Sequence, residues 1–384
     1  EKSGAARSAN TMRPIRPARA NHMTYKTQIE SLAWEDMDLP LKVPFAIAAG
    51  QQDVAANLLV KVTLVCGVCG YGEAAPFPAF NGETRACVRA ALESVRARVI
   101  GINVRHWRKF ARELKDILPS GAARCALETA VLDAFTRYQK VSMWRYLGGG
   151  RHTLRTDLTI TAGTVTEARA AAADAVARGF RKLKIKVGAG DPLADVERLR
   201  AIHEAAPAVA LLLDANAGFT ADEALILLGG LRGPGIKPAL FEQPVAAEDL
   251  DGLARVHREG RVAVAADESA SSTDDVRALI KRHAVQVVNI KLMKSGLNES
   301  MEMAWLAREA GLKTMIGGLV ESSLAMSMSA CFAAGSGGFS FVDLDTPLFL
   351  AAEPFAGGLT YDGDHIKVTH IKEGHGVTPV GATR

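Results

Sequence analysis

Residues 182–188 of this 384-residue chain read Lys182-Leu183-Lys184-Ile185-Lys186-Val187-Gly188. Lysines alternate here with branched apolar residues, and a period of two is typical of a β-strand. Successive side chains of a strand point to opposite faces, so Lys184 and Lys186 share one face and the apolar residues share the other. In an α/β fold the apolar face meets the helices, which directs both lysines to the inside. A solvated stripe of lysines is the alternative, and it requires an inner face open to water.

Short apolar segments recur around this strand and alternate with amphipathic stretches. We expect strands at 156–161, 182–187, 210–214, 239–242, 262–267, 286–291, 313–316 and 339–343. Helical patterns lie between them, for example at 166–178, 192–205, 221–231 and 300–310. Eight strands in alternation with helices predict a parallel α/β fold.

Charged residues fall at the carboxyl ends of seven of these expected strands, with one βα unit between neighbours. They are Lys186, Asp214, Glu242, Asp267, Lys291, Glu321 and Asp343, at spacings of 28, 28, 25, 24, 30 and 22 residues. An open sheet would spread such residues along an edge. A closed barrel brings them to one mouth, where barrel enzymes carry out their chemistry, so the spacing favours the barrel.

The segments on either side of the barrel follow a different pattern. Residues 58–65 form a β-rich run, residues 83–146 have a helical period, and the Gly148-Gly149-Gly150 sequence ends this part. We expect an α+β unit over residues 24–148 and the barrel over 149–353. Residues 354–384 lose the βα rhythm and are expected to complete the N-terminal unit as added strands.

Charge and composition exclude several classes of protein. The chain has 46 basic and 42 acidic residues, but its first 23 residues hold five of the cations and one anion, so the rest is balanced at 41 of each. A neutral body argues against nucleic acid as the partner. The sequence contains no apolar run of about 18 residues, so we expect no membrane span. Five cysteines in so long a chain favour a reducing compartment, and we expect the cytoplasm.

Residues 1–23 are rich in arginine and poor in acids, which predicts a vector-derived tag or misassigned leader with the native start near Met23. A nucleic-acid-binding arm is the alternative.

Three carboxylates lie on consecutive expected strands at Asp214, Glu242 and Asp267. Such a set suits a hard divalent cation, and Mg²⁺ takes few protein carboxylates and leaves positions for substrate oxygens. The alternative is that each acid caps the helix that follows its strand. Three acids beside inward-facing lysines favour the metal.

Lys291 lies on the sixth expected strand, across the barrel from Lys184 and Lys186 on the second. Two lysines on opposite sides of a metal-bound carboxylate substrate can remove a proton from a carbon and return one to the other face. A lysine base needs its pKa lowered from about 10.4 to roughly 7 to 8. We expect repulsion from Lys184 and the metal to lower it, and the metal to stabilise the resulting enediolate.

Five ordered motifs carry a resemblance to a known family. They are Asp214-Ala215-Asn216, Phe241-Glu242-Gln243-Pro244, Ala266-Asp267-Glu268-Ser269, Lys184-Ile185-Lys186 and Asn289-Ile290-Lys291. From about Thr27 to its C-terminus the chain resembles the muconate-lactonizing subgroup of the enolase superfamily. The resemblance implies an α+β capping domain and a modified TIM barrel, (β/α)7β, with one Mg²⁺ per subunit on Asp214, Glu242 and Asp267. It also implies Lys186 and Lys291 as the acid/base pair, with Lys184 as an auxiliary.

The subgroup includes several reactions, and Asp343-Leu344-Asp345 favours one of them. Two carboxylates on one face resemble the pair with which dipeptide epimerases hold a free ammonium. The resemblance therefore implies an isomerase that inverts the α-carbon of the C-terminal residue of a dipeptide by 1,1-proton transfer. Muconate cycloisomerase, o-succinylbenzoate synthase and N-acylamino-acid racemase remain alternatives, as does an acid pair that caps the turn before Pro347. A Schiff-base lyase and a non-catalytic binding barrel are further alternatives.

The expected capping loop, residues 46–57 with Gly50 and Asp53, contains no Arg or Lys. An Ala-Glu epimerase would place a cation there, so the sequence argues against glutamate as the second residue. Asp53 with Phe77 and Phe80 suits an apolar or cationic one. Glu321 either hydrogen-bonds a catalytic lysine or caps the next helix. We expect a homo-oligomer.

Overall fold

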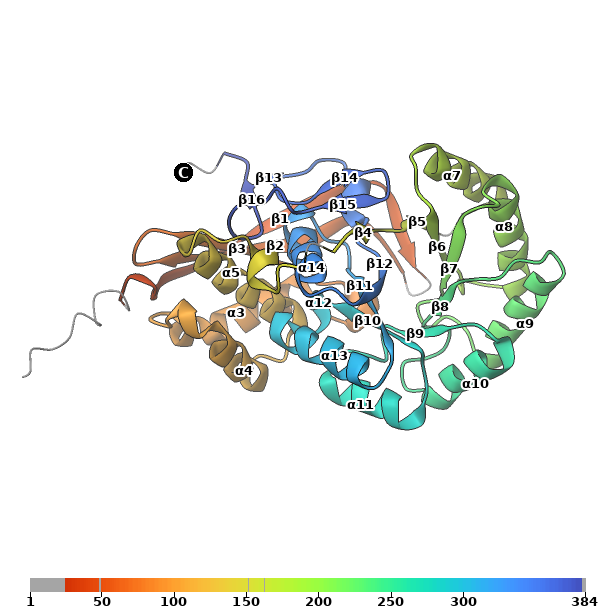
Figure 1. The fold of residues 1–384 in the computed structure, drawn as a ribbon, viewed down its shortest axis with the longest axis horizontal. Coiled ribbons are helices and arrows are strands. Elements are labelled where there is room, and N and C mark those ends of the chain that lie inside the picture. The colour runs from red at the N-terminus through yellow and green to blue at the C-terminus, as the bar shows by residue number, and fades with distance from the viewer. Residues whose placement is uncertain (1–24, 48–49, 151, 162, 382–384) are drawn as a thin grey trace, which may run out of the picture.

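The computed structural model describes residues 25–47, 50–150, 152–161 and 163–381. Its N-terminal part is a three-stranded antiparallel sheet covered by helices, at the opposite end of the molecule from most of the barrel helices (Figure 1). The strands are β1 (Ile29–Ile47), β2 (Gly50–Leu64) and β3 (Cys69–Ala74). The helices are α2 (Pro78–Asn81), α3 (Arg85–Val99), η1 (Val104–His106), α4 (Trp107–Ile117), α5 (Gly121–Tyr138) and α6 (Met143–Tyr146).

Helix α5 lies directly on strand β3 and forms the centre of this part. Residues 121–136 of the helix are all buried. Two glycines of β3 permit the close approach, because a Cβ on Gly72 would lie 1.9 Å from the carbonyl oxygen of Ala126 and one on Gly70 would lie 2.2 Å from that of Ala130. Any larger residue at either position would push the helix off the sheet.

An eight-stranded parallel sheet follows, in the strand order of the chain. Its strands are β5 (Leu158–Ile160), β6 (Lys182–Lys186), β7 (Ala210–Asp214), β8 (Leu240–Glu242), β9 (Val264–Ala266), β10 (Val287–Lys291), β11 (Lys313–Gly317) and β12 (Phe339–Val342). The Asp157 N–H donates to the Val342 carbonyl at 3.1 Å and joins the two edges of the sheet. All eight expected strands are present, and the barrel is confirmed.

Each of the first seven barrel strands is followed by helix, and the helices form the outer layer (Figure 1). They are α7 (Val165–Ala177), α8 (Pro192–Ala205), α9 (Ala221–Arg232), α10 (Leu250–Gly260), α11 (Thr273–Arg282), α12 (Leu292–Ser295), α13 (Leu297–Glu309) and α14 (Ser323–Ser336). Only the short η2 (Thr346–Phe349) follows β12, so the (β/α)7β architecture is also confirmed. Local signals start these helices: Thr164 with Glu167 forms a capping box at α7, and Asp191 caps α8 ahead of Pro192.

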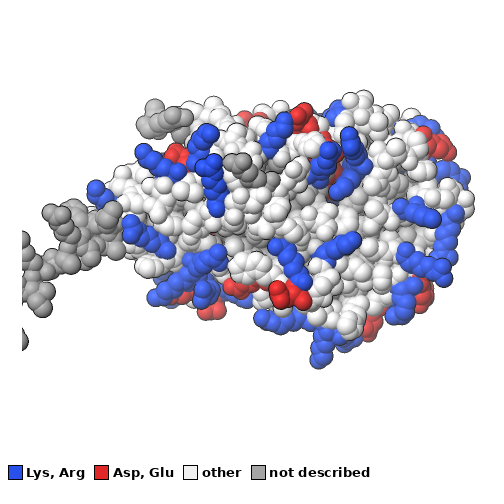
Figure 2. Space-filling view, in the orientation of Figure 1, with Lys and Arg blue, Asp and Glu red and all other residues white. Residues whose placement is uncertain are grey.

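The alternation in β6 has the expected orientation. Leu183 and Ile185 are fully buried in the apolar core, and Lys184 and Lys186 are 2% and 6% exposed. The lysines therefore point into the barrel. In contrast, the basic side chains that Figure 2 shows are spread over the visible surface among neutral residues.

The expected capping loop, residues 46–57, lies at the tip of the hairpin between β1 and β2, in which Ile47 pairs with Gly50; residues 48–49 lie outside the described part. One expectation about the periphery is wrong. The C-terminal strands β13 (Phe355–Gly357), β14 (Thr360–Asp362), β15 (His365–Lys367) and β16 (Val377–Pro379) add nothing to the N-terminal sheet. β13 pairs with β16, and β14 and β15 form a small sheet with β4 (Leu154–Arg155).

A buried carboxylate ties the N-terminal sheet to the mouth of the barrel. Glu73 of β3 accepts from the Asn57 side chain at 2.7 Å and from the backbone N–H groups of Ser322 at 3.0 Å and Ala325 at 3.2 Å. The last two are free N–H groups in the first turn of α14, and a carboxylate is favoured there. Asn57 also donates to the Val320 carbonyl at 3.0 Å. The loop between β11 and α14 is thereby held to the N-terminal unit.

A buried histidine ties the C-terminal segment to α5. The His375 backbone N–H donates to Asp133, its Nε2 lies 3.0 Å from the Tyr71 carbonyl oxygen, and the Val377 N–H donates to its Nδ1 at 3.1 Å. The neutral ring with its proton on Nε2 satisfies both contacts.

Among the described residues no helix has the length and apolarity to cross a membrane.

We expect this histidine to make the fold sensitive to acid. Burial lowers the pKa of His375 below its ordinary value and Arg137 adds to this, although Asp133 opposes it. The stabilisation is therefore complete above about pH 6.5, the ordinary value, and is lost as the pH falls below it. The midpoint temperature of thermal unfolding, Tm, should fall by several degrees for the wild type when the pH is lowered from 7.5 to 5.5. In the His375→Gln variant, the part of this fall that is due to His375 should be absent. The same pH dependence in both proteins would contradict this.

Candidate active site

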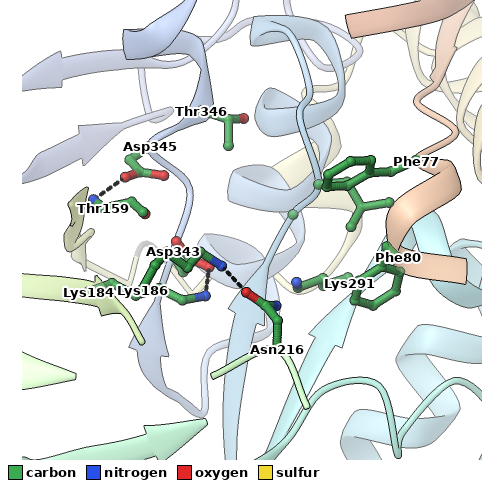
Figure 3. Close-up of a pocket in the computed structure, with 12 residues that line it drawn as sticks. Phe77, Phe80, Thr159, Lys184, Lys186, Asn216, Lys291, Asp343, Asp345 and Thr346 are labelled. Carbon is green, nitrogen blue, oxygen red and sulfur yellow. Dashed lines mark hydrogen bonds and ion pairs between the residues drawn. The ribbon is translucent and has the colours of Figure 1, made fainter. Parts of the chain in front are cut away.

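Three of the charged strand ends, Lys186, Lys291 and Asp343, line one pocket in the mouth of the barrel (Figure 3). Lys184 and Lys186 enter from one side, and Lys291 enters from the other beside Phe80. The lining residues are Phe77, Phe80, Thr159, Lys184, Lys186, Asn216, Lys291, Gly318, Leu319, Asp343, Asp345 and Thr346.

Sheet register puts the key residues in one row. Lys186 is paired with Asp214, and Asp214 is paired with Glu242 on the next strand. Asp267 follows the end of β9, directly beyond Ala266. The three acids that were expected to hold a metal are therefore neighbours, and each is at most 1% exposed.

Four ammonium groups gather on these three carboxylates. Lys184 Nζ lies 2.9 Å from both Asp214 and Glu242, and Lys186 Nζ lies 2.7 Å from Asp214. Asp267 contacts Lys291 Nζ at 2.6 Å and Lys294 Nζ at 2.8 Å. A position that lies between two carboxylate oxygens and attracts an ammonium group is suited to a cation.

The donor set fits a hard divalent cation. The acids do not cap the helices that follow them, because the N-caps of α9, α10 and α11 are Thr220, Asp249 and Ser272. The alternative that Asp214, Glu242 and Asp267 are helix caps is therefore wrong. Asn289 donates to Glu242 Oε1 at 2.6 Å and fixes the orientation of that carboxylate. Three preoriented carboxylates on adjacent strands are ligands that Mg²⁺ prefers.

Electrostatics within the acid set are uneven. Burial raises the pKa of Asp214, but Lys184 and Lys186 outweigh this and hold it well below its ordinary value. Lys291 and Lys294 do the same for the pKa of Asp267. Burial and then Asp214 raise the pKa of Glu242 to about 7. A further cation would therefore lower the pKa of Glu242 more than that of Asp214 or Asp267.

Carboxylates raise the pKa of two lysines of the pocket, Lys184 and Lys291. Burial lowers the pKa of Lys184, but Asp214, Asp343 and Glu242 together raise it well above its ordinary value. Burial also lowers the pKa of Lys291, and Asp267 outweighs it in the same way. The cause is the close approach of these carboxylates to the two ammonium groups, at 2.6 to 2.9 Å. The lowered pKa that the sequence predicts for a lysine base beside Lys184 and a bound metal stays a prediction.

The acid pair after β12 lies at the wall of the pocket. Asp343 accepts from Lys184 Nζ at 2.8 Å, and Asp345 Oδ2 accepts from the Thr159 N–H at 2.6 Å. Asp345 precedes η2 but makes no side-chain cap there, so the capping alternative is not what this structure has. Burial and then Asp343 raise the pKa of Asp345 to about 7.

Three other expected residues differ from the prediction or lie elsewhere. Glu321 Oε1 accepts from the Leu319 N–H at 2.7 Å, whereas Ser322 caps α14, so neither of its two expected contacts is among the described hydrogen bonds. Burial raises the pKa of Glu321 to about 8. Asp53 is exposed on β2, and it and Gly50 are absent from the described lining of the pocket.

Sequence reasoning missed several residues of the site. Lys294 donates to Asp267 and to the Asn289 carbonyl, and it could have been found as a lysine one helical turn after Lys291. Asn216 accepts from Lys186 Nζ at 2.8 Å and has a left-handed backbone with a φ of 43°. Thr159 and Thr346 carry no local signal that distinguishes them from other residues.

Comparisons with known proteins agree with this geometry. Residues 31–148 match the family model of the mandelate racemase / muconate lactonizing enzyme N-terminal domain, and residues 167–382 match the enolase C-terminal domain-like model. An aromatic dipeptide epimerase from Herpetosiphon aurantiacus is 47% identical over 91% of this chain and 99% of its own length.

Solved structures show the same likeness. The crystal structure of a mandelate racemase/muconate lactonizing enzyme from Roseiflexus sp. is 52% identical, with a TM-score of 0.89 over 94% of this chain and 100% of that one. A dipeptide epimerase from Enterococcus faecalis, in complex with Mg and the dipeptide L-Leu-L-Tyr, is 30% identical, with a TM-score of 0.87 over 91% and 99%. Because both family models are matched, the chain belongs to the enolase superfamily.

Proposed function

We propose that the protein is a Mg²⁺-dependent dipeptide epimerase that inverts the α-carbon of the C-terminal residue. The observation that carries the proposal is the arrangement of the pocket, which has lysines on two opposite sides and a carboxylate pair at a third. The two lysines suit proton transfer at one carbon. The carboxylate pair suits a free ammonium, which a dipeptide has and an N-acylated amino acid lacks. The names of the relatives support the same reaction.

Each group of charged residues has a separate task in this proposal. Asp214, Glu242 and Asp267 hold one Mg²⁺, which when bound accepts negative charge from the substrate carboxylate and stabilises it as the α-proton leaves. Lys186 and Lys291 face opposite sides of the α-carbon, and each removes or returns a proton on its own side. Lys184 assists from beside Lys186. Asp343 and Asp345 bind the ammonium and set the distance from it to the reacting carbon.

The side chain of the C-terminal residue is proposed to be apolar or aromatic. Phe77 and Phe80 come from the N-terminal unit and line the pocket on the side of Lys291, whose Nζ lies 5.0 Å from the centre of the Phe80 ring. The Phe80 ring attracts the Lys291 ammonium group, which also pairs with Asp267, and helps to hold it near the reacting carbon. Glu321, Gly50 and Asp53 remain proposed contacts to the rest of the substrate.

Three wider expectations also remain proposals. We propose an N-terminal capping domain over residues 24–148 and a catalytic barrel over residues 149–353, with residues 354–384 packed against the capping domain through His375 and not added to its sheet. The absence of disulfides among five free cysteines supports the cytoplasm. A homo-oligomer is proposed as the assembled form.

Isotope exchange tests the reaction directly. In deuterated water with Mg²⁺, dipeptides with an apolar or aromatic C-terminal residue should gain deuterium at the α-carbon of that residue as the epimer accumulates. Mass spectrometry and NMR would locate the label, and a chelator should stop the exchange. Absence of exchange across a full dipeptide library would refute the assignment.

Removal of one lysine should separate the two half-reactions. Lys186→Met and Lys291→Met should each reduce epimerisation by about a thousandfold, because one face loses its proton donor or acceptor. Each variant should still exchange the α-proton of one diastereomer only, and the two variants should select opposite diastereomers. Lys182→Met, on the far end of the same strand, is the matched control and should keep wild-type activity. Exchange of the same diastereomer by both variants would argue against two-base transfer.

Phe80 should set the preference for the second side chain. Phe80→Ala should lower kcat/KM about fivefold for a dipeptide with a C-terminal aromatic residue, because an aromatic pair contributes about 1 kcal/mol. The effect on C-terminal alanine should be smaller than twofold. Trp305→Ala, on the exposed outer surface of α13, is the control. An equal loss for both dipeptides would show that Phe80 acts on the pocket as a whole.

A further inference from the structure

A third buried carboxylate lies with Asp343 and Asp345. Carboxylate oxygens of Asp157, Asp343 and Asp345 all lie within 4.8 Å of one another. Asp157 precedes β5, and its backbone N–H closes the barrel against Val342. It is fully buried and is not part of the pocket lining, so it lies behind the other two carboxylates.

The three carboxylates differ in their hydrogen-bond donors. Asp343 accepts from Lys184, and Asp345 accepts from the Thr159 N–H. Neither oxygen of Asp157 has a donor among the described residues, and Asp345 Oδ1 also lacks one. A buried polar atom without a partner is costly, and an ionised carboxylate without donors is more costly still.

Charge balance requires a proton in this cluster. Three negative charges within 4.8 Å have one ammonium group, that of Lys184, as an ion-pair partner among the described residues. Two carboxylates at such a distance already share a proton in known sites. The proton belongs on Asp157, because protonation of this acid breaks no existing hydrogen bond. A carboxylate oxygen of Asp343 and one of Asp345 lie nearby and can accept from it.

Electrostatics agree with this location of the proton. Burial raises the pKa of Asp157 well above its ordinary value, and the nearby Asp343 and Asp345 raise it further. Lys184 lowers it, and contact with the Asp343 carboxylate raises it again. The other titratable group nearby is Tyr361, which burial holds in its neutral form and which donates to the Leu344 carbonyl at 2.6 Å.

We propose that Asp157 is a positioning residue of the ammonium site: it remains a neutral acid and donates its proton to the Asp343 and Asp345 pair, holding both carboxylates toward the pocket. This inference rests on the proposed dipeptide substrate. Asp157 touches no substrate itself. It supplies the donor that the pair lacks on its buried side, so that the outward oxygens of the pair remain available to the substrate ammonium.

Two substitutions at one position separate a donor from a charge. Asp157→Asn keeps the shape, the neutrality and a donor, whereas Asp157→Val leaves a neutral apolar side chain that has no donor. Asp364→Asn is the matched control, because Asp364 is a buried aspartate of the same region that pairs with Arg155 at 2.9 Å and lies outside the cluster.

The measured quantity is discrimination for the ammonium group. The full chain with Mg²⁺ is tested against a dipeptide substrate and against its des-amino analogue, which lacks only the N-terminal ammonium. Asp157→Val should raise the KM of the dipeptide about tenfold and change the inhibition constant of the analogue less than twofold. Asp157→Asn and Asp364→Asn should stay within about threefold of the wild type for both.

Three results would overturn the proposal. Equal weakening of both ligands by Asp157→Val would indicate a structural role only. Loss of discrimination in Asp157→Asn as large as in Asp157→Val would indicate an ionised third carboxylate. Wild-type behaviour of Asp157→Val would remove any role in binding.

An infrared spectrum keeps the test valid if Asp157→Val fails to fold or if dipeptides are not the substrate. At neutral pH the difference between the wild type and Asp157→Asn should contain the C=O stretch of a protonated carboxyl group, and the difference for Asp364→Asn should not. This readout needs no substrate, so a wild type that is inactive on dipeptides would count against the proposed function alone. A missing band would refute the neutral Asp157.

Discussion

The structure depends on the pairing of buried charges at the mouth of the barrel. Four lysine ammonium groups and three carboxylates lie in an interior where each is almost fully shielded from water. An unpaired buried charge costs several kcal/mol, and removal of one member of a buried pair is strongly destabilising. The strands β6 to β10 can therefore adopt this arrangement only because every ammonium group reaches a carboxylate. The same requirement keeps the lysines close to the position where substrate carbon is expected.

The N-terminal unit contributes to the site through packing as well as through its aromatic residues. Gly72 allows α5 to lie on β3, and Glu73 from the same strand binds the first turn of α14. The loop before α14 carries Gly318 and Leu319, which line the pocket. A change in how the sheet docks would therefore reach the pocket wall through two residues of one strand. Through this connection, residues of the N-terminal unit and residues of the barrel that are far apart in the sequence lie at the same pocket.

Much of this fold could be predicted from sequence because its signals are local. The period of two in β6 and the regular spacing of strand ends located Lys186, Asp214 and Glu242 in the order that the register confirms. The pairing of β15 with β4 could not be predicted, because each strand is two or three residues long and the two lie about 200 residues apart in the chain. The raised pKa of Lys184 and Lys291 could not be predicted either. It depends on contacts of 2.6 to 2.9 Å between strands, which no spacing along one strand reports.

The excess of acid at the mouth identifies the kind of substrate that would complete it. Asp214, Glu242, Asp267, Asp343 and Asp345 face the four lysines, and Asp157 and Glu321 lie directly behind them. Burial raises the pKa of Glu321 to about 8, so the site reduces its own charge by keeping such acids neutral. A divalent cation at the three strand-end acids and an ammonium at the acid pair would each bind at carboxylates that attract positive charge. A substrate with a carboxylate at one end and an ammonium at the other matches both positions at once, whereas a dicarboxylate would bring negative charge to Asp343 and Asp345. In the proposed function, charge complementarity would therefore select zwitterionic peptides before any side chain is recognised.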